Sequence, residues 1–157
     1  MTPAIAAAER AGVEYFVHEY QHDPAHPSYG QEAAESLGVP PERVFKTLVA
    51  RLADGRLGVG IVPVTMQLDL KALAKALGAK KATMAGVPDA ERATGYVTGG
   101  ISPLGQKQQL ATALDESALA FALIHVSAGR RGLEIGLTPG DLARLTSAVL
   151  APIARTR

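Results

Sequence analysis

The chain has 157 residues, of which 47% are hydrophobic, so it can fill the core of one domain but hardly of two. It contains no cysteine, which excludes disulfide bonds, thiolate zinc sites and a cysteine nucleophile in the protein itself. The net charge of +1 is too small for a protein that grips long nucleic acid through many phosphates, so any RNA partner must be held locally.

No segment of the sequence resembles a membrane anchor. The longest uninterrupted apolar run, residues 118–124, is too short to cross a bilayer. Residues 1–10 have neither a basic region nor a long apolar stretch, so they do not form a secretory signal. We therefore expect a soluble, cytoplasmic protein.

The N-terminal part predicts two helices separated by a strand. A helix is expected over residues 2–12, because Thr2 can cap it and Gly12 can end it. Residues 13–20 alternate as a strand does, and a second helix is expected over residues 28–38.

The loop before this second helix carries regularly spaced histidines. His18, His22 and His26 are four residues apart, which on a helix would align three metal ligands. Pro24 and Pro27 prevent such a helix. We therefore expect ordinary loop histidines, with no metal site and no cofactor.

The segment 44–52 predicts a strand with a charged residue on its apolar face. That residue is Lys46, which either reaches solvent along its own methylenes or lines a pocket where a positive charge is useful. Asp54 and Gly55 form a hairpin signal, so residues 57–64 are expected to be the partner strand.

A helix over about residues 69–77 follows from the spacing of its apolar residues, and Gly78 can end it. A compact group of lysines lies on and after this helix: Lys71, Lys75, Lys80 and Lys81. They form either a solvated surface or a contact to RNA, and the sequence leaves both open. A short strand over residues 82–85 and a helix over residues 88–94 follow.

Residues 94–107 fit neither a helix nor a strand. Pro103 stiffens this segment, and its four glycines let the main chain approach a ligand closely: Gly95, Gly99, Gly100 and Gly105. The segment is either a binding loop or a plain connection. Two of the glycines have the spacing of a phosphate-binding loop, but Gln106 stands where that motif requires lysine, which excludes it.

Three buried strands and a final helix are expected over residues 110–114, 122–127, 133–137 and 138–146. The turn between the last two strands carries Arg130 and Arg131, which either pair with phosphates or are simply exposed. The elements together predict a single mixed α/β (α+β) domain, in which a strongly bent mixed sheet or barrel is flanked by helices.

The longest distinctive string, Gly-Gly-Ile-Ser-Pro-Leu-Gly-Gln-Lys, covers residues 99–107 and is far more specific than a glycine pair. Shorter blocks occur at residues 20–24, 45–48, 67–71, 76–81, 127–133 and 140–143. In order and spacing, these blocks resemble the YbaK family of trans-acting editing proteins, which deacylate mischarged aminoacyl-tRNA. The resemblance covers nearly the whole chain and is strongest to the Cys-tRNA(Pro) deacylase branch.

The resemblance implies an editing-domain fold over residues 1–157, with tRNA(Pro) charged with cysteine as the partner and prolyl-tRNA synthetase as a possible second one. In the family, a lysine at the place of Lys46 is the side chain most closely tied to activity. The residues expected to contact the substrate are Tyr20, Thr47, Thr98, Ser102, Pro103, Ser127, Gly129 and Arg130.

The sequence offers no side chain placed for covalent catalysis. A nucleophile elbow is absent, and no histidine lies near Ser102 in sequence. We therefore assign catalysis to Lys46 and to the main-chain N–H groups of Gly99, Gly100 and Ile101, which could stabilise an oxyanion. The thiol of a cysteinyl substrate could then attack its own ester.

Two alternatives stay open at this stage. The chain could be an alanyl-tRNA(Pro) deacylase that uses water, or a module that binds tRNA or a synthetase without catalysis. It departs from the close branch at Ala128, where that branch usually has glycine, and at Glu134, where aspartate is usual. Both departures lie near the expected substrate end, so the amino-acid preference is left open.

Overall fold

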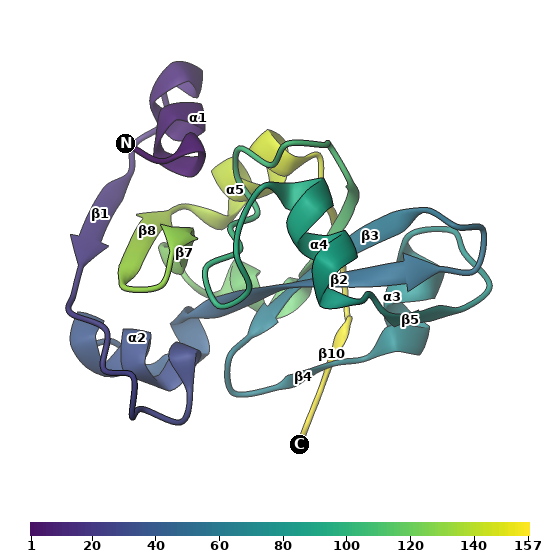
Figure 1. Ribbon diagram of the computed structural model, residues 1–157, viewed down its shortest axis with the longest axis horizontal. Helices are drawn as coiled ribbons and strands as arrows, with labels where there is room; N and C mark the ends of the chain where they lie inside the picture. Colours follow the sequence, from purple (N-terminus) through teal and green to yellow (C-terminus); the bar gives the residue numbers. More distant parts are fainter.

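The computed structural model describes residues 1–157, and its strands fall into three sheets (Figure 1). The five-stranded mixed sheet has the order β5 (Ala82–Met84), β2 (Phe45–Leu52), β3 (Leu57–Pro63), β6 (Ala111–Asp115) and β9 (Val149–Ala151). The antiparallel three-stranded sheet has the order β1 (Phe16–Glu19), β8 (Leu133–Leu137) and β7 (Ile124–Arg130). The two-stranded sheet joins β10 (Ala154–Arg155) to β4 (Gln67–Leu68).

Five α-helices and two short 3-10 helices surround these sheets. They are α1 (Pro3–Ala11), α2 (Tyr29–Leu37), α3 (Leu70–Ala76), α4 (Val87–Thr94), α5 (Pro139–Thr146), η1 (Pro41–Arg43) and η2 (Glu116–Ala120). None of the helices is long and apolar enough to cross a membrane.

The mixed α/β class is confirmed, whereas the barrel alternative is wrong. Strand pairing between the two larger sheets is limited to one isolated bridge, from Val44, just before β2, to His125 on β7. Because that contact does not continue along the strands, neither sheet closes on itself. The free stretch at the start of β2 is the place where the pocket described below opens.

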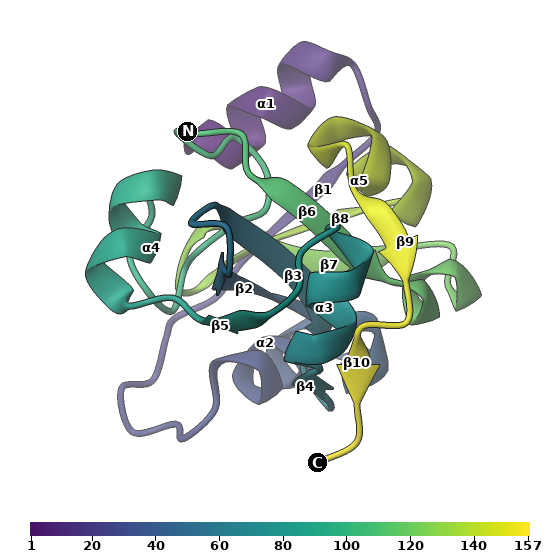
Figure 2. The ribbon, with the colours of Figure 1, turned by 90° about the vertical axis from the view of Figure 1, so that its right-hand side faces the viewer.

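The large sheet is buried on both faces. One face packs against an 18-residue core that includes residues of α1, α5 and the β1–β8–β7 sheet. On the other face, residues of the sheet form a 9-residue core together with α3, β4 and Ile153. Figure 2 shows α1 at one end of the molecule and α3 with β10 toward the other. The two termini also lie at opposite ends in both ribbon views.

Local sequence signals explain where the helices begin and end. Thr2, Ser28, Asp69 and Thr138 each accept a main-chain N–H at the start of α1, α2, α3 and α5. Gly12, Gly38 and Gly95 adopt positive φ at the ends of α1, α2 and α4, a conformation that glycine takes without strain. These caps confirm the predicted helices.

Strand boundaries differ more from the prediction. The first strand begins at Phe16 rather than at residue 13. Strands β4, β9 and β10 were not predicted, because two or three residues are too few to show an alternating pattern. The hairpin of β2 and β3 pairs as expected, with Phe45 opposite Pro63 and Arg51 opposite Leu57.

Candidate active site

A pocket of about 430 Å³ opens beside the start of β2. Its walls come from β2, α2, α4, the glycine loop and one face of the β1–β8–β7 sheet. Of the residues expected from the sequence to form a site, the structure brings together Tyr20, Lys46, Thr47, Thr98, Gly99, Ile101 and Ser127. Five others do not line it: Gly100, Ser102, Pro103, Gly129 and Arg130.

Lys46 reaches the pocket from the face of β2 that was predicted, the face that it shares with Leu48 and Ala50. Its ammonium makes no ion pair, and burial, followed by the charge of Arg157, lowers its pKa. The lysine is therefore a partly desolvated cation at a concave surface, which suits the binding of an anion or a hydroxyl group.

Thr47 lies on the opposite face of β2 and also lines the pocket. Its hydroxyl is buried and has no hydrogen-bond partner in the protein. An unsatisfied buried hydroxyl is unfavourable, so Thr47 is an unpaired polar group in the pocket wall.

The glycine loop presents fewer free donors than the sequence suggested. The N–H of Gly100 donates to the carbonyl of Val97 at 2.9 Å, so it is already used in a turn. The N–H groups of Gly99 and Ile101 make no hydrogen bond within the protein, and both residues line the pocket. Of the three donors predicted from the sequence, those of Gly99 and Ile101 are therefore without a partner in the protein.

Gly99 and Gly100 are needed for different reasons. Gly99 has φ +96°, and a Cβ there would lie 2.5 Å from the ring of Tyr29. At Gly100 a Cβ would lie 2.6 Å from the Cα of Arg130, on the turn between β7 and β8. The bare face of Gly100 thus packs against the hairpin and not, as expected, against a substrate.

Ser127 fastens this loop to the hairpin. Its hydroxyl donates to the carbonyl of Gly100 at 3.0 Å and accepts the N–H of Gly129 at 3.2 Å. Gly129 itself has φ +117° and packs against Tyr96 and Thr2. Ser127 therefore holds the pocket wall in place, and Gly129 supports the turn from behind.

Three further residues expected to contact the substrate lie outside the pocket. Ser102 is fully buried, and its hydroxyl accepts the N–H of Leu104, so it serves the loop's own structure. Pro103 is buried outside the pocket. Arg130 is exposed and forms an ion pair with Glu19 of β1, away from the pocket.

Arg131 and not Arg130 faces the pocket, together with Tyr29. The guanidinium carbon of Arg131 lies 3.4 Å from the centre of the Tyr29 ring, and its Nη2 is 3.7 Å from a carboxylate oxygen of Glu32. Alternation along β7 cannot choose between adjacent arginines in a turn, so the sequence could not make this distinction.

Glu134 is the one carboxyl group that lines the pocket. It is 7% exposed, and burial raises its pKa from 4.5 to about 8. Tyr20 lies nearby, and its pKa is raised to about 12 by burial and then by the charges of Glu134 and Glu32. The end of the pocket at Glu134 therefore lacks a cation that balances this carboxyl group.

The aminoacyl-tRNA editing domain family matches residues 23–145 of this sequence. The chain belongs to this family. It is also 42% identical over 154 residues to the Enterococcus faecalis (strain ATCC 700802 / V583) protein named "Putative Cys-tRNA(Pro)/Cys-tRNA(Cys) deacylase EbsC", covering 97% of this chain and 92% of that protein. The family and the enzyme class expected from the sequence, an aminoacyl-tRNA deacylase, are thereby confirmed.

Solved structures agree with the editing-domain assignment. A crystal structure described as "a putative trans-editing enzyme for prolyl tRNA synthetase" superposes with a TM-score of 0.83 at 25% identity, over 98% of this chain and 95% of that chain. The hypothetical protein APE2540 superposes with a TM-score of 0.86 at 21% identity, over 98% and 99% of the two chains, which supports the fold alone.

The pocket of this editing domain holds no side-chain nucleophile paired with a base. No histidine lines it, because His18, His22 and His26 bond instead to α2 side chains: Ser36 at 3.0 Å, Glu32 at 2.9 Å and Glu35 at 3.2 Å, respectively. No group of three or more histidine, aspartate or glutamate side chains could hold a metal ion. His18 thus attaches β1 to α2, and His22 and His26 attach the loop before α2 to the same helix.

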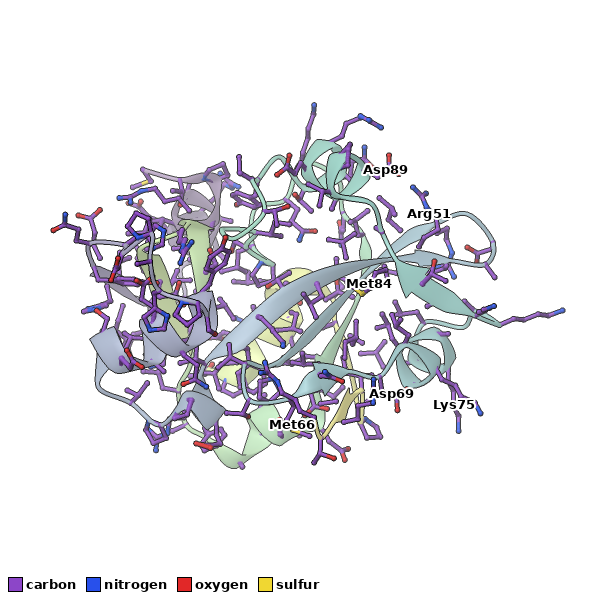
Figure 3. All side chains as sticks on the ribbon, turned by 60° about the horizontal axis from the view of Figure 1, so that its bottom comes forward. Arg51, Met66, Asp69, Lys75, Met84 and Asp89 are labelled. Carbon is purple, nitrogen blue, oxygen red and sulfur yellow. The ribbon has the colours of Figure 1, made fainter.

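The four lysines on and after α3 do not line the pocket. Lys71, Lys75, Lys80 and Lys81 are exposed, and Figure 3 shows Lys75 pointing away from the body of the protein. By contrast, Arg51 of β2 bonds to Asp89 of α4 at 3.0 Å, which ties the helix beside the pocket to the sheet.

Proposed function

We propose that this editing domain removes cysteine from mischarged tRNA(Pro), and that residues 1–157 act as one catalytic unit. The name of the Enterococcus faecalis relative supports the substrate, since it refers to Cys-tRNA(Pro) and Cys-tRNA(Cys). One observation supports the chemistry most directly: Gly99 and Ile101, which line the pocket, have main-chain N–H groups without a partner, and no nucleophile paired with a base lines it.

Glu134 is suited to the α-amino group of the esterified amino acid. In the empty pocket its pKa of about 8 leaves it mostly protonated at neutral pH. An entering α-ammonium group would stabilise the carboxylate and form a charge-assisted hydrogen bond. This contact requires a free amino group, so peptidyl-tRNA and N-acylated aminoacyl-tRNA should be poor substrates.

The substrate thiol can supply the nucleophile that the protein lacks. Its sulfur, with an ordinary pKa of about 8.5, attacks the carbonyl carbon of its own ester, and the bond from that carbon to the 3′-oxygen of tRNA breaks. The thiol proton ends on the 3′-oxygen, and the other product is a four-membered thiolactone that water opens to cysteine. The N–H groups of Gly99 and Ile101 would stabilise the negative charge on the carbonyl oxygen.

The protein's part in this scheme is to position the reacting atoms. Lys46 would fix the terminal nucleotide through its 2′-hydroxyl or phosphate, and Thr47 offers a further hydrogen bond. An aminoacyl ester is already reactive, so orientation and two well-placed donors are sufficient for a useful acceleration.

Release of amino acid from purified charged tRNA tests the proposed function. We expect the protein alone to free cysteine from Cys-tRNA(Pro) and to leave Pro-tRNA(Pro) intact. A parallel reaction with prolyl-tRNA synthetase measures whether that enzyme is needed. Tight binding of tRNA with no release in either reaction would favour the non-catalytic module instead.

A further inference from the structure

Two cations of the pocket have no acidic partner. Lys46 and Arg157 both line the cavity, and neither forms an ion pair with a carboxylate, although most arginines of the chain do. The third pocket cation, Arg131, is paired with Glu32. Two cationic side chains, contributed by segments far apart in the sequence, therefore reach the pocket without an acidic side chain as partner.

Hydrogen bonds and strand pairing fix the C-terminal segment just before Arg157. Asp115 accepts the N–H groups of Ile153 and Ala154, both at 3.0 Å, and Ile153 is fully buried. Strand β10 then pairs with β4, and a guanidinium N–H of Arg157 donates to the carbonyl of Val64 at 3.0 Å. Arg157 itself is exposed, and these contacts place its guanidinium group beside the pocket.

Holding two like charges near each other is unfavourable without an anion. Burial lowers the pKa of Lys46 most, and the positive charge of Arg157 lowers it further. A bound anion would offset the repulsion between the two cations and the cost of burying Lys46, because it would stabilise the ammonium and the guanidinium together. Arginine also suits phosphate in particular, since its planar fork can donate two parallel hydrogen bonds.

The acidic group and the two unpaired cations of the pocket come from different parts of the fold. Its one carboxyl group, Glu134, lies on the β1–β8–β7 sheet, whereas Lys46 and the carbonyl that holds Arg157 belong to the hairpin of β2 and β3 and its end. An aminoacylated tRNA end has matching polarity, with an α-ammonium group on the amino acid and a phosphate before the terminal adenosine.

We propose that Lys46 and Arg157 together bind the phosphate that precedes the terminal adenosine of the charged tRNA, so that the ester lies between this anion site and Glu134. This inference rests on the proposed deacylase function for its substrate. It adds Arg157 as a positioning residue and fixes the direction in which the acceptor end enters.

Binding of adenosine 5′-monophosphate and of adenosine, measured by titration calorimetry, isolates the contribution of the phosphate. We expect the nucleotide to bind the wild-type protein at least about tenfold more tightly than the nucleoside, as for a charge-assisted contact. Arg157→Met and Lys46→Met should each reduce this ratio to less than about threefold. Arg155→Met, the matched control, removes an exposed arginine two residues away that does not line the pocket and should keep the wild-type ratio.

Inorganic phosphate is the competing source of the same chemistry. It should displace the nucleotide only at much higher concentration, because the adenosine also contacts the pocket. Equal competition by inorganic phosphate, equal affinity of the wild-type protein for the two nucleosidic probes, or an unchanged ratio in Arg157→Met would each overturn the inference. Equal losses in Arg155→Met and Arg157→Met would overturn it too, since they would indicate only a general charge effect.

The same variants, assayed for kcat/KM on Cys-tRNA(Pro), separate this inference from the proposed function. We expect Arg157→Met to lower kcat/KM about tenfold, with a shallower dependence on salt, and Arg155→Met to have little effect. Nucleotide discrimination in a wild-type protein that releases no cysteine would refute the deacylase proposal while keeping the phosphate site. If the protein releases cysteine but Arg157→Met changes neither binding nor kcat/KM, the deacylase proposal is kept and the phosphate site is refuted.

Discussion

Replacing Glu134 with glutamine tests the buried, mostly neutral state of this pocket carboxyl group. The unfolded chain loses the Glu134 proton near the ordinary pKa of 4.5, whereas the folded protein keeps it to about pH 8. Between these values the folded state binds more protons than the unfolded state, so stability falls as the pH rises. Glutamine has nearly the same shape and does not titrate, so the variant should not share this loss.

The size of the effect follows from the two pKa values. One pKa unit corresponds to about 1.36 kcal/mol, and after allowing for partial titration at both ends the wild-type protein should lose roughly 3 to 4 kcal/mol relative to Glu134→Gln between pH 5 and pH 8. Urea unfolding of both proteins at the two pH values measures this difference directly.

A difference between the proteins that does not change with pH would refute the reasoning, because Glu134 would then ionise as an exposed carboxyl group does. The same variant should also lower kcat/KM for Cys-tRNA(Pro), since an amide cannot balance the α-ammonium charge. Wild-type activity of a folded Glu134→Gln protein would remove this residue from substrate binding.

Further outcomes are expected from variants of the other pocket elements. Lys46→Ala should fold and lower kcat/KM by roughly 10²-fold, because it removes a positioning contact, and near wild-type kinetics would exclude that role. Gly100→Val should lower the free energy of unfolding by more than about 2 kcal/mol and abolish activity, because the new side chain meets the main chain of Arg130. Gly140→Ala should do neither, because nothing lies within 4 Å of a Cβ there, and thermal unfolding distinguishes the two variants. Activity should survive exhaustive chelation and vary little with salt, and a chelator-sensitive or steeply salt-dependent reaction would contradict the proposed chemistry.

The sequence predicted the framework well because its signals are local. Caps such as Thr2 and Ser28, and glycines such as Gly12 and Gly38, define helix ends within a few residues, and their structures agree. The face of Lys46 also followed from simple alternation along β2. Sheet closure, in contrast, depends on long-range pairing, which no local pattern specifies, so the barrel alternative could not be excluded.

The pocket was predicted only in part, for a similar reason. Membership of the glycine loop does not tell which face of each residue is free, and the structure assigns the bare face of Gly100 to the β7–β8 turn. Arg157 carried no signal at all, because it reaches the pocket through a two-residue strand and the buried Ile153. Glu134 was noted as a departure from the family, but its burial is a tertiary property.

In the proposed mechanism the substrate supplies the nucleophile, and the protein supplies orientation and two main-chain donors. Single-turnover rates for cysteinyl, seryl and alanyl esters on one tRNA, with mass analysis of the released compound, test it most directly. If the substrate thiol is the nucleophile, only the cysteinyl ester should be cleaved fast, with a cyclic thioester as first product. A seryl hydroxyl ionises far less readily than a thiol, and alanine has neither group. Equal rates for all three esters, or direct release of free amino acid, would contradict it and favour the water-using alanyl-type reaction in the same pocket.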